Sequence, residues 1–205
     1  MSFDLLLLLL DRIGVFVFAV SGGVVAVRAR MDVLGVLVLA FLPALGGGTL
    51  RDLILDAPVF WLTDGWSLSM VALGAAAAFF FTPFLEGFKP IRWADAVGMA
   101  LFAVTGAAKA MELGFGLPII AIMGGLIASA GGLLRDVVAN REPLLLKEDI
   151  YATAALLGAL GFALSVRAGL SPRLATGVGF GLAFALRACA IRYGWSLPSR
   201  ALDDA

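Results

Sequence analysis

Seven long, mostly apolar stretches account for most of this 205-residue chain. An α-helix of roughly 20 apolar residues crosses the hydrocarbon core of a bilayer, so each stretch predicts a transmembrane helix. The predicted helices cover about residues 5–27, 33–55, 68–85, 94–113, 117–139, 150–166 and 174–193. With 61% hydrophobic and only 15% charged residues, the surface must be solvated by lipid. We predict an all-α membrane protein with one transmembrane domain, residues 1–205.

The composition excludes several classes of function. Fifteen Lys and Arg residues balance fifteen Asp and Glu residues, which argues against a nucleic-acid partner. The chain has no His and one cysteine, Cys189, so imidazole catalysis, the usual zinc sites and an intrachain disulfide are excluded. We predict no metal and no cofactor. The first apolar run lacks the basic flank of a signal peptide, so we retain it as a helix.

The distribution of Lys and Arg between the loops predicts the orientation, because cytoplasmic loops carry the positive charge. An N-terminus outside and a C-terminus in the cytoplasm places eight basic residues on the cytoplasmic side: Arg28, Arg30, Lys89, Arg92, Arg141, Lys147, Arg192 and Arg200. Four remain outside: Arg12, Lys109, Arg167 and Arg173. The opposite orientation would reverse this bias, so we predict the N-terminus outside.

The chain contains an internal duplication. A shift of 84 positions superimposes the pattern Gly-Gly-x-Leu-Arg-Asp at residues 47–52 on residues 131–136. The same shift aligns further pairs: Asp11 with Asp95, Gly14 with Gly98, Ser21 with Thr105 and Gly22 with Gly106. Chance matches between apolar segments seldom place charged pairs at one common offset. We interpret the pattern as a true duplication.

Each copy contains three predicted helices, an odd number, so the second copy must enter the membrane from the opposite side. We predict two inverted three-helix repeats, about residues 5–86 and 93–167, followed by a seventh helix at about 172–195. In transporters with inverted repeats, the substrate path lies where interrupted helices of the two copies meet.

Glycine clusters interrupt the second and fifth predicted helices. Gly46, Gly47 and Gly48 follow Pro43, and the later cluster is Gly131 with Gly132. Each glycine weakens a helix by roughly 1 kcal/mol relative to Ala, and proline removes a backbone donor, so we expect kinks or unwinding. Freed carbonyl groups could then line a wet path and bind cations. The alternative is that these glycines only allow close helix packing.

An Arg-Asp pair follows each glycine cluster. Ionisable side chains within a span cost about 2.5–3.5 kcal/mol on insertion scales, so these side chains should point into the protein. We predict cross-pairing around the axis that relates the copies, with Arg51 beside Asp136 and Arg135 beside Asp52. The alternative is that the charges are solvated caps at an interface.

Other polar residues have two readings each. Ser21 and Thr105 could line the same path, or could bond back to their own helices. Lys109 and Glu112 are spaced for an interfacial ion pair. The functional alternative is that Lys109 is a gating or voltage-sensing residue.

In the last helix, we expect Arg187 to reach the cytoplasmic interface. Gly177 and Gly181 have the spacing of a close helix contact within or between protomers.

At its duplicated motifs the chain resembles the trimeric intracellular cation channel family, in particular its short prokaryotic members. Residues 46–52 and 131–136 match the two family signatures, except that Ala130 replaces the first glycine of the second cluster. The resemblance implies a homotrimer in a prokaryotic plasma membrane, surrounded by lipid, with one hourglass pore per protomer. It also implies conduction of monovalent cations such as potassium, with sodium as a further candidate, along the second and fifth helices, which are bent at the glycines.

We therefore predict a potassium-type cation channel. The predicted cation path comprises Gly46, Gly47, Gly48, Arg51, Asp52, Gly131, Gly132, Arg135, Asp136, Ser21 and Thr105, with Lys109 as the gating candidate. The alternative is a secondary transporter of a small solute such as glycine, because inverted repeats also serve alternating access. An enzyme is disfavoured, because the chain offers no recognisable nucleophile.

Overall fold

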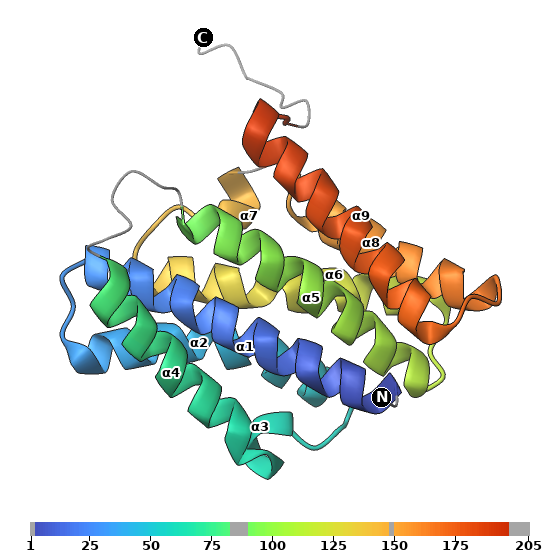
Figure 1. Cartoon of the computed structure of the whole chain (residues 1–205), viewed down its shortest axis with the longest axis horizontal. Helices are drawn as coiled ribbons and strands as arrows, with labels where there is room; N and C mark the ends of the chain where they lie inside the picture. Colours follow the sequence, from blue (N-terminus) through green and yellow to red (C-terminus); the bar gives the residue numbers. More distant parts are fainter. Residues whose placement is uncertain (1–2, 83–89, 148–149, 197–205) are drawn as a thin grey trace, which may run out of the picture.

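The computed structural model describes residues 3–82, 90–147 and 150–196, and its regular structure there is helical (Figure 1). The elements are α1 (Phe3–Arg28), α2 (Val33–Ile54), α3 (Phe60–Thr63), α4 (Gly65–Phe81), α5 (Pro90–Glu112), α6 (Leu117–Val138), α7 (Leu144–Lys147), α8 (Ala152–Arg167) and α9 (Pro172–Tyr193). The seven long helices coincide with the seven predicted stretches. The two four-residue helices, α3 and α7, were not predicted. The predicted end of the third stretch, and Lys89 and Arg200 of the charge count, lie outside the described residues.

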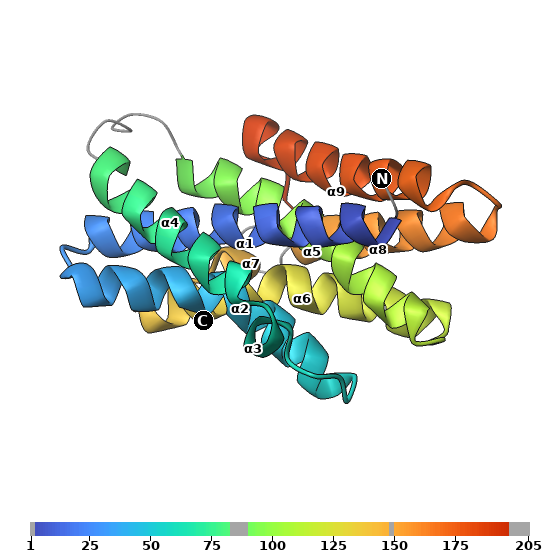
Figure 2. The same ribbon diagram turned by 60° about the horizontal axis from the view of Figure 1, so that its bottom comes forward.

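The long helices form two three-helix bundles that pack against each other. The first bundle contains α1, α2 and α4, and the second contains α5, α6 and α8. Contacts of α1 with α5 and of α2 with α6 join the bundles, and α9 packs on α8 and α5. Within each joining pair the helices run in opposite directions (Figures 1 and 2).

Equivalent residues of the two bundles make reciprocal contacts. A Cβ atom on Gly14 of α1 would lie 2.6 Å from the ring of Phe102, and one on Gly98 of α5 would lie 2.8 Å from the ring of Phe18. The two rings themselves pack with centroids 5.1 Å apart. Because each contact recurs at the 84-residue offset, each bundle contacts the other through equivalent residues.

The contact between α2 and α6 repeats this reciprocity. A Cβ atom on Gly47 would lie 2.6 Å from the carbonyl oxygen of Ile127, and one on Gly131 would lie 2.3 Å from that of Pro43. Real side chains do not tolerate such distances from backbone atoms, so glycine is required at both positions. These glycines allow the two helices to cross at close range.

The glycine clusters do not unwind their helices, so the expected unwinding is wrong, whereas a kink at the glycines stays a prediction. Helix α2 is continuous from Val33 to Ile54 with Pro43 inside it, and α6 is continuous from Leu117 to Val138. The physical reason is that the bundles hold the glycines between packed helices, where tertiary contacts override a weak intrinsic preference. The packing alternative therefore accounts for Gly47 and Gly131.

Several helices are long and apolar enough to cross a membrane. By length and hydropathy these are residues 33–54, 92–112, 117–138 and 172–193, and shorter apolar helices cover residues 65–81 and 152–167. Large apolar side chains such as Leu34, Leu53 and Phe80 are exposed along the outside of the bundles. Such a surface suits contact with lipid chains rather than water.

Gly177 and Gly181 of α9 face no other helix in the described part of the protomer. A Cβ atom on either residue would meet no described atom of another element within 4 Å. Gly179, two positions from each of them, instead faces α8: a Cβ atom on Gly179 would lie 2.8 Å from the carbonyl oxygen of Gly158. The contact within the protomer therefore uses Gly179, and the predicted role of Gly177 and Gly181 remains open only for contacts between protomers.

Candidate functional site

Each Arg-Asp pair closes on itself at the end of its helix. Arg51 donates to Asp52 from Nε at 2.7 Å and from Nη2 at 3.2 Å. Arg135 donates to Asp136 in the same way, at 2.8 and 3.0 Å. Two parallel bonds between a guanidinium and a carboxylate are strong and directional. Each aspartate therefore neutralises the arginine that precedes it.

The same aspartates hold the short helices that follow. The backbone N–H of Phe60, the first residue of α3, donates to Asp52 Oδ2 at 2.9 Å, and that of Leu144, the first residue of α7, donates to Asp136 Oδ2 at 3.0 Å. Phe60 and Leu144 are again 84 positions apart. The motif thus fixes the chain that leaves each helix, a role that the sequence analysis missed.

The predicted cross-pairing of the two motifs is wrong. Helices α2 and α6 are antiparallel and cross at Gly47 and Gly131, so Arg51 and Asp136 lie beyond the crossing in opposite directions. At a rise of 1.5 Å per residue, the nine residues between them amount to roughly 13 Å along the axis. The neighbouring aspartate is within reach of each arginine, and the distant one is not.

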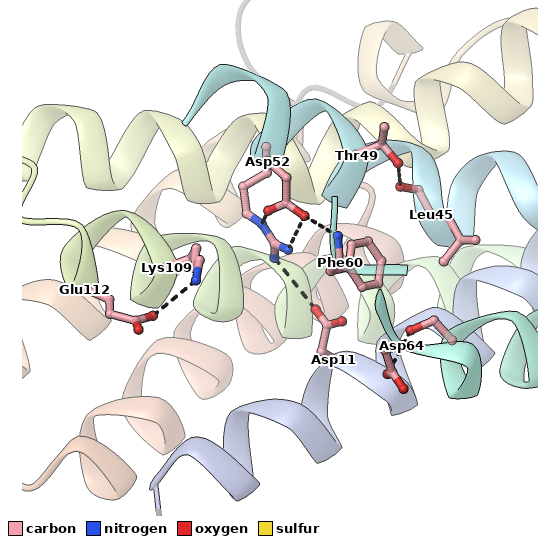
Figure 3. A network of polar contacts seen from close by, with 10 residues as sticks. Asp11, Leu45, Thr49, Asp52, Phe60, Asp64, Lys109 and Glu112 are labelled. Carbon is pink, nitrogen blue, oxygen red and sulfur yellow. Dashed lines mark hydrogen bonds and ion pairs between the residues drawn. The ribbon is translucent and has the colours of Figure 1, made fainter. Parts of the chain in front are cut away.

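The first-bundle site, defined as Asp11, Arg51, Asp52 and Thr105, faces a cavity. Arg51 Nη1 lies 3.8 Å from Asp11 Oδ1, and the side chains of Arg51 and Asp11 are 8% and 19% exposed. Arg51 also stands over the ring of Phe60, 5.4 Å from its centroid. Asp11 of α1 and Asp52 of α2 both contact this guanidinium, and Figure 3 shows Phe60 close to Asp52.

The cavity at this site has a volume of about 520 Å³ and lies between α1, α2, α3 and α5. Two cationic side chains, Arg51 and Lys109, line the cavity. Five carboxylate side chains line it as well: Asp4, Asp11, Asp52, Asp64 and Glu112. Asp64 forms an ion pair with Arg12 at 3.4 Å, and Lys109 forms the predicted pair with Glu112 at 3.6 Å. The lining is therefore acidic overall, and it attracts cations and repels anions.

The second-bundle site, defined as Ser21, Asp95, Arg135 and Asp136, is sealed. Arg135 Nη1 donates to Asp95 Oδ1 at 2.7 Å and to Ser21 Oγ at 2.6 Å. The side chains of Arg135 and Asp95 are fully buried, and that of Asp136 is 4% exposed. Ser21 therefore serves the arginine of the other bundle and does not bond back to its own helix.

Two further buried residues complete the second-bundle site. Tyr151, at the start of α8, donates weakly to the carbonyl oxygen of Ala128 at 3.4 Å. Arg187 of α9 is fully buried and stands over the Tyr151 ring, 4.9 Å from its centroid. The expectation that Arg187 reaches the membrane interface is therefore wrong, because packing against the aromatic ring holds it inside.

The structure separates the predicted path residues into groups. Arg51, Asp52, Thr105 and Lys109 line the cavity. Gly47 and Gly131 lie at the helix crossing, whereas a Cβ atom on Gly46, Gly48 or Gly132 would meet the side chain of Leu134, Phe60 or Asp95, respectively. Ser21, Arg135 and Asp136 form the sealed site.

Asp11 and Asp95 belong to the two sites although the sequence analysis did not select them. Their signal was present, because both fall on the 84-residue offset together with the motifs. Within the described residues, no group of three or more His, Cys, Asp or Glu side chains is arranged to hold a metal ion.

Comparison with known proteins identifies relatives over nearly the whole chain. A family model described as a glycine transporter matches residues 8–83 and again residues 92–167. The UPF0126 membrane protein YvgT of Bacillus subtilis is 36% identical over 195 residues, which cover 94% of this chain and 95% of the relative. The inner membrane protein YadS of Escherichia coli is 37% identical over 202 residues, 95% of this chain and 96% of the relative. The chain is a multi-pass membrane protein like these relatives.

Solved structures with the same fold include two prokaryotic channels. A TRIC trimeric intracellular cation channel orthologue from Rhodobacter sphaeroides has a TM-score of 0.88 and 40% identity, over 93% of this chain and 99% of the other. A prokaryotic TRIC channel crystallised in potassium chloride has a TM-score of 0.88 and 29% identity, over 95% and 100%. These neighbours are ion channels and not enzymes, in agreement with the prediction for this chain. The chain therefore belongs to the trimeric intracellular cation (TRIC) channel family.

Proposed function

We propose that this chain is a monovalent cation channel of the potassium type, with one pore in each protomer of a homotrimer. The observation that carries the proposal is the acidic cavity at the first-bundle site. Its five carboxylates outnumber Arg51, Lys109 and the Asp64 partner Arg12 by two charges, and such a lining raises the local concentration of cations. The solved relatives, which are cation channels, support the same function.

We infer that the two bundles are inverted repeats in a seven-helix transmembrane domain, with α9 as the seventh spanning helix. The opposite directions of α1 and α5, and of α2 and α6, support this arrangement (Figure 1). The reciprocal glycine contacts support it further. In the predicted orientation, the N-terminus and the cavity face the outer side of a prokaryotic plasma membrane, and the second-bundle site lies toward the cytoplasm.

We infer that cations enter through the cavity and pass beside Arg51, whose charge Asp52 neutralises. The second-bundle site then forms the barrier in the described conformation, because its arginine is buried and paired with two buried carboxylates. Conduction requires that this site open. Lys109 is placed to influence entry, since it lines the cavity and is held there by an exposed carboxylate.

A recording from purified protein in a planar bilayer tests the function. With a potassium chloride gradient across the bilayer, we expect discrete openings that reverse near the potassium equilibrium potential. Arg51→Ala should change the conductance. Saturable uptake coupled to a counter-ion, without discrete currents, would instead indicate a carrier for a small solute such as glycine.

A further inference from the structure

The two sites use equivalent oxygen atoms differently. In the second-bundle site, Arg135 Nη1 bridges Asp95 Oδ1 and Ser21 Oγ at 2.7 and 2.6 Å. The equivalent residues of the first-bundle site are Asp11 and Thr105. There the Nη1 atom of Arg51 stays 3.8 Å from Asp11, and the hydroxyl of Thr105 has no hydrogen-bond partner among the described residues.

The hydroxyl of Thr105 is buried and has no hydrogen-bond partner in the part of the chain that the structure describes. The residue is only 5% exposed, and it lines the same cavity as Asp11. A buried hydroxyl without a partner costs about 1–3 kcal/mol. A ligand in the cavity would remove that cost.

The charges around these atoms favour a cation as the ligand. Asp52 engages Arg51 with both of its oxygens, so the Asp11 carboxylate keeps only a long contact of 3.8 Å to Arg51. Lys109, one turn further along α5 from Thr105, is paired with Glu112 at 3.6 Å and does not supply the missing cation. One weakly paired carboxylate and one hydroxyl suit a monovalent cation better than a divalent one, which prefers several charged ligands.

We propose that a monovalent cation binds between the Asp11 carboxylate and the Thr105 hydroxyl, where the second bundle places a guanidinium nitrogen. This site rests on the proposed function in that the conducted ion would be its natural ligand. The cation would occupy the first binding site on the path, within the acidic cavity.

Thermal unfolding of the full-length purified protein tests the site without any current. Potassium chloride replaces N-methylglucamine chloride at constant ionic strength, so that general screening stays the same. A ligand that binds only the folded state raises the midpoint temperature with its concentration. We expect potassium to stabilise the wild-type protein.

Thr105→Val keeps the shape and breaks no hydrogen bond within the described protein, so the variant should fold. We expect it to need at least tenfold more potassium for the same stabilisation. Thr105→Ser restores the hydroxyl in the form that Ser21 has in the other bundle, and it should respond like the wild type. Asp11→Asn should also weaken the response at least tenfold.

Asp56→Asn is the matched control, because it removes the same charge from an exposed residue that does not line the cavity. It should leave the potassium response within twofold of the wild type. An unchanged response in Thr105→Val and Asp11→Asn, or an equal loss in Asp56→Asn, would overturn the site.

Failure of the site and failure of the function are distinguishable. If the protein carries cation currents but its stabilisation by potassium does not depend on Thr105, the binding site is refuted and the channel function stands. If the stabilisation depends on Thr105 but the protein carries no current, the binding site stands and the channel function is refuted.

Discussion

The two Arg-Asp sites are built from equivalent residues, yet one lines a cavity and the other is sealed. In the first bundle, Asp11 is 3.8 Å from Arg51 and partly exposed. In the second, Asp95 is 2.7 Å from Arg135 and fully buried. The difference lies in what surrounds them, because α9 packs on the second bundle and places Arg187 over Tyr151. The helix outside the duplication thus breaks the equivalence of the two copies.

The largest difference is expected between Asp95→Asn and Asp11→Asn. Removing Asp95 leaves the buried Arg135 with one carboxylate fewer, and breaking a buried pair costs about 3–5 kcal/mol. Asp11 is partly exposed and weakly paired, so its loss should cost less than about 1 kcal/mol. Unfolding midpoints of both variants in one detergent measure this. Equal losses would mean that the two sites are not different.

The helix crossing should be equally sensitive in both bundles. Gly131→Ala places a Cβ atom 2.3 Å from the carbonyl oxygen of Pro43, and Gly47→Ala places one 2.6 Å from that of Ile127. Since backbone must move, each should lose about 2–3 kcal/mol of stability. Gly46→Ala is the control, because it meets only the end of the Leu134 side chain. The unfolding midpoints of the three variants, compared with that of the wild type, measure these losses. A Gly131→Ala protein as stable as the wild type would contradict the close crossing.

A smaller contrast is expected between the two hydroxyl residues. Ser21→Ala removes an acceptor from the buried Arg135, which should cost about 1–2 kcal/mol. Thr105→Val removes a buried hydroxyl that bonds to no described residue, so in potassium-free buffer the variant should unfold at a midpoint no lower than that of the wild type. If both variants lose the same stability, Thr105 has a protein partner after all.

The smallest effect should come from the pair at the mouth of the cavity. Glu112→Gln frees Lys109 from a pair in which both side chains are well exposed, and such pairs contribute less than about 0.5 kcal/mol. The unfolding midpoint should therefore not change. Single-channel current provides the second readout: if Lys109 influences entry, its release should alter the conductance, and an unaltered current would remove Lys109 from the gating role.

Local sequence signals predicted the helices well and the contacts of the motifs poorly. Apolar length located all seven long helices, and the 84-residue offset paired Asp11 with Asp95 and Ser21 with Thr105. Helix propensity suggested that the helices unwind at the glycines, but propensity takes no account of the neighbouring helix against which Gly131 packs. Cross-pairing failed because the sequence does not give the point where α2 and α6 cross.

The long-range partners were also out of reach of the sequence. Arg135 bonds to Ser21, 114 residues away, and nothing local to either residue indicates that bond. Arg187 stood near a predicted helix end, where snorkelling is the ordinary expectation. Only its packing over Tyr151 shows that it is internal.

If the cavity at the first-bundle site leads into the conducting path, a bulky cation attached to its lining should block the current. Thr63→Cys, in a Cys189→Ala background, places a thiol on an exposed residue of the cavity lining. Ala168→Cys, exposed in the turn between α8 and α9, is the control. A membrane-impermeant, positively charged thiol reagent added on the cavity side should reduce the potassium current of the Thr63→Cys protein and spare the control. An unchanged current in protein whose mass confirms modification at residue 63 would contradict the account.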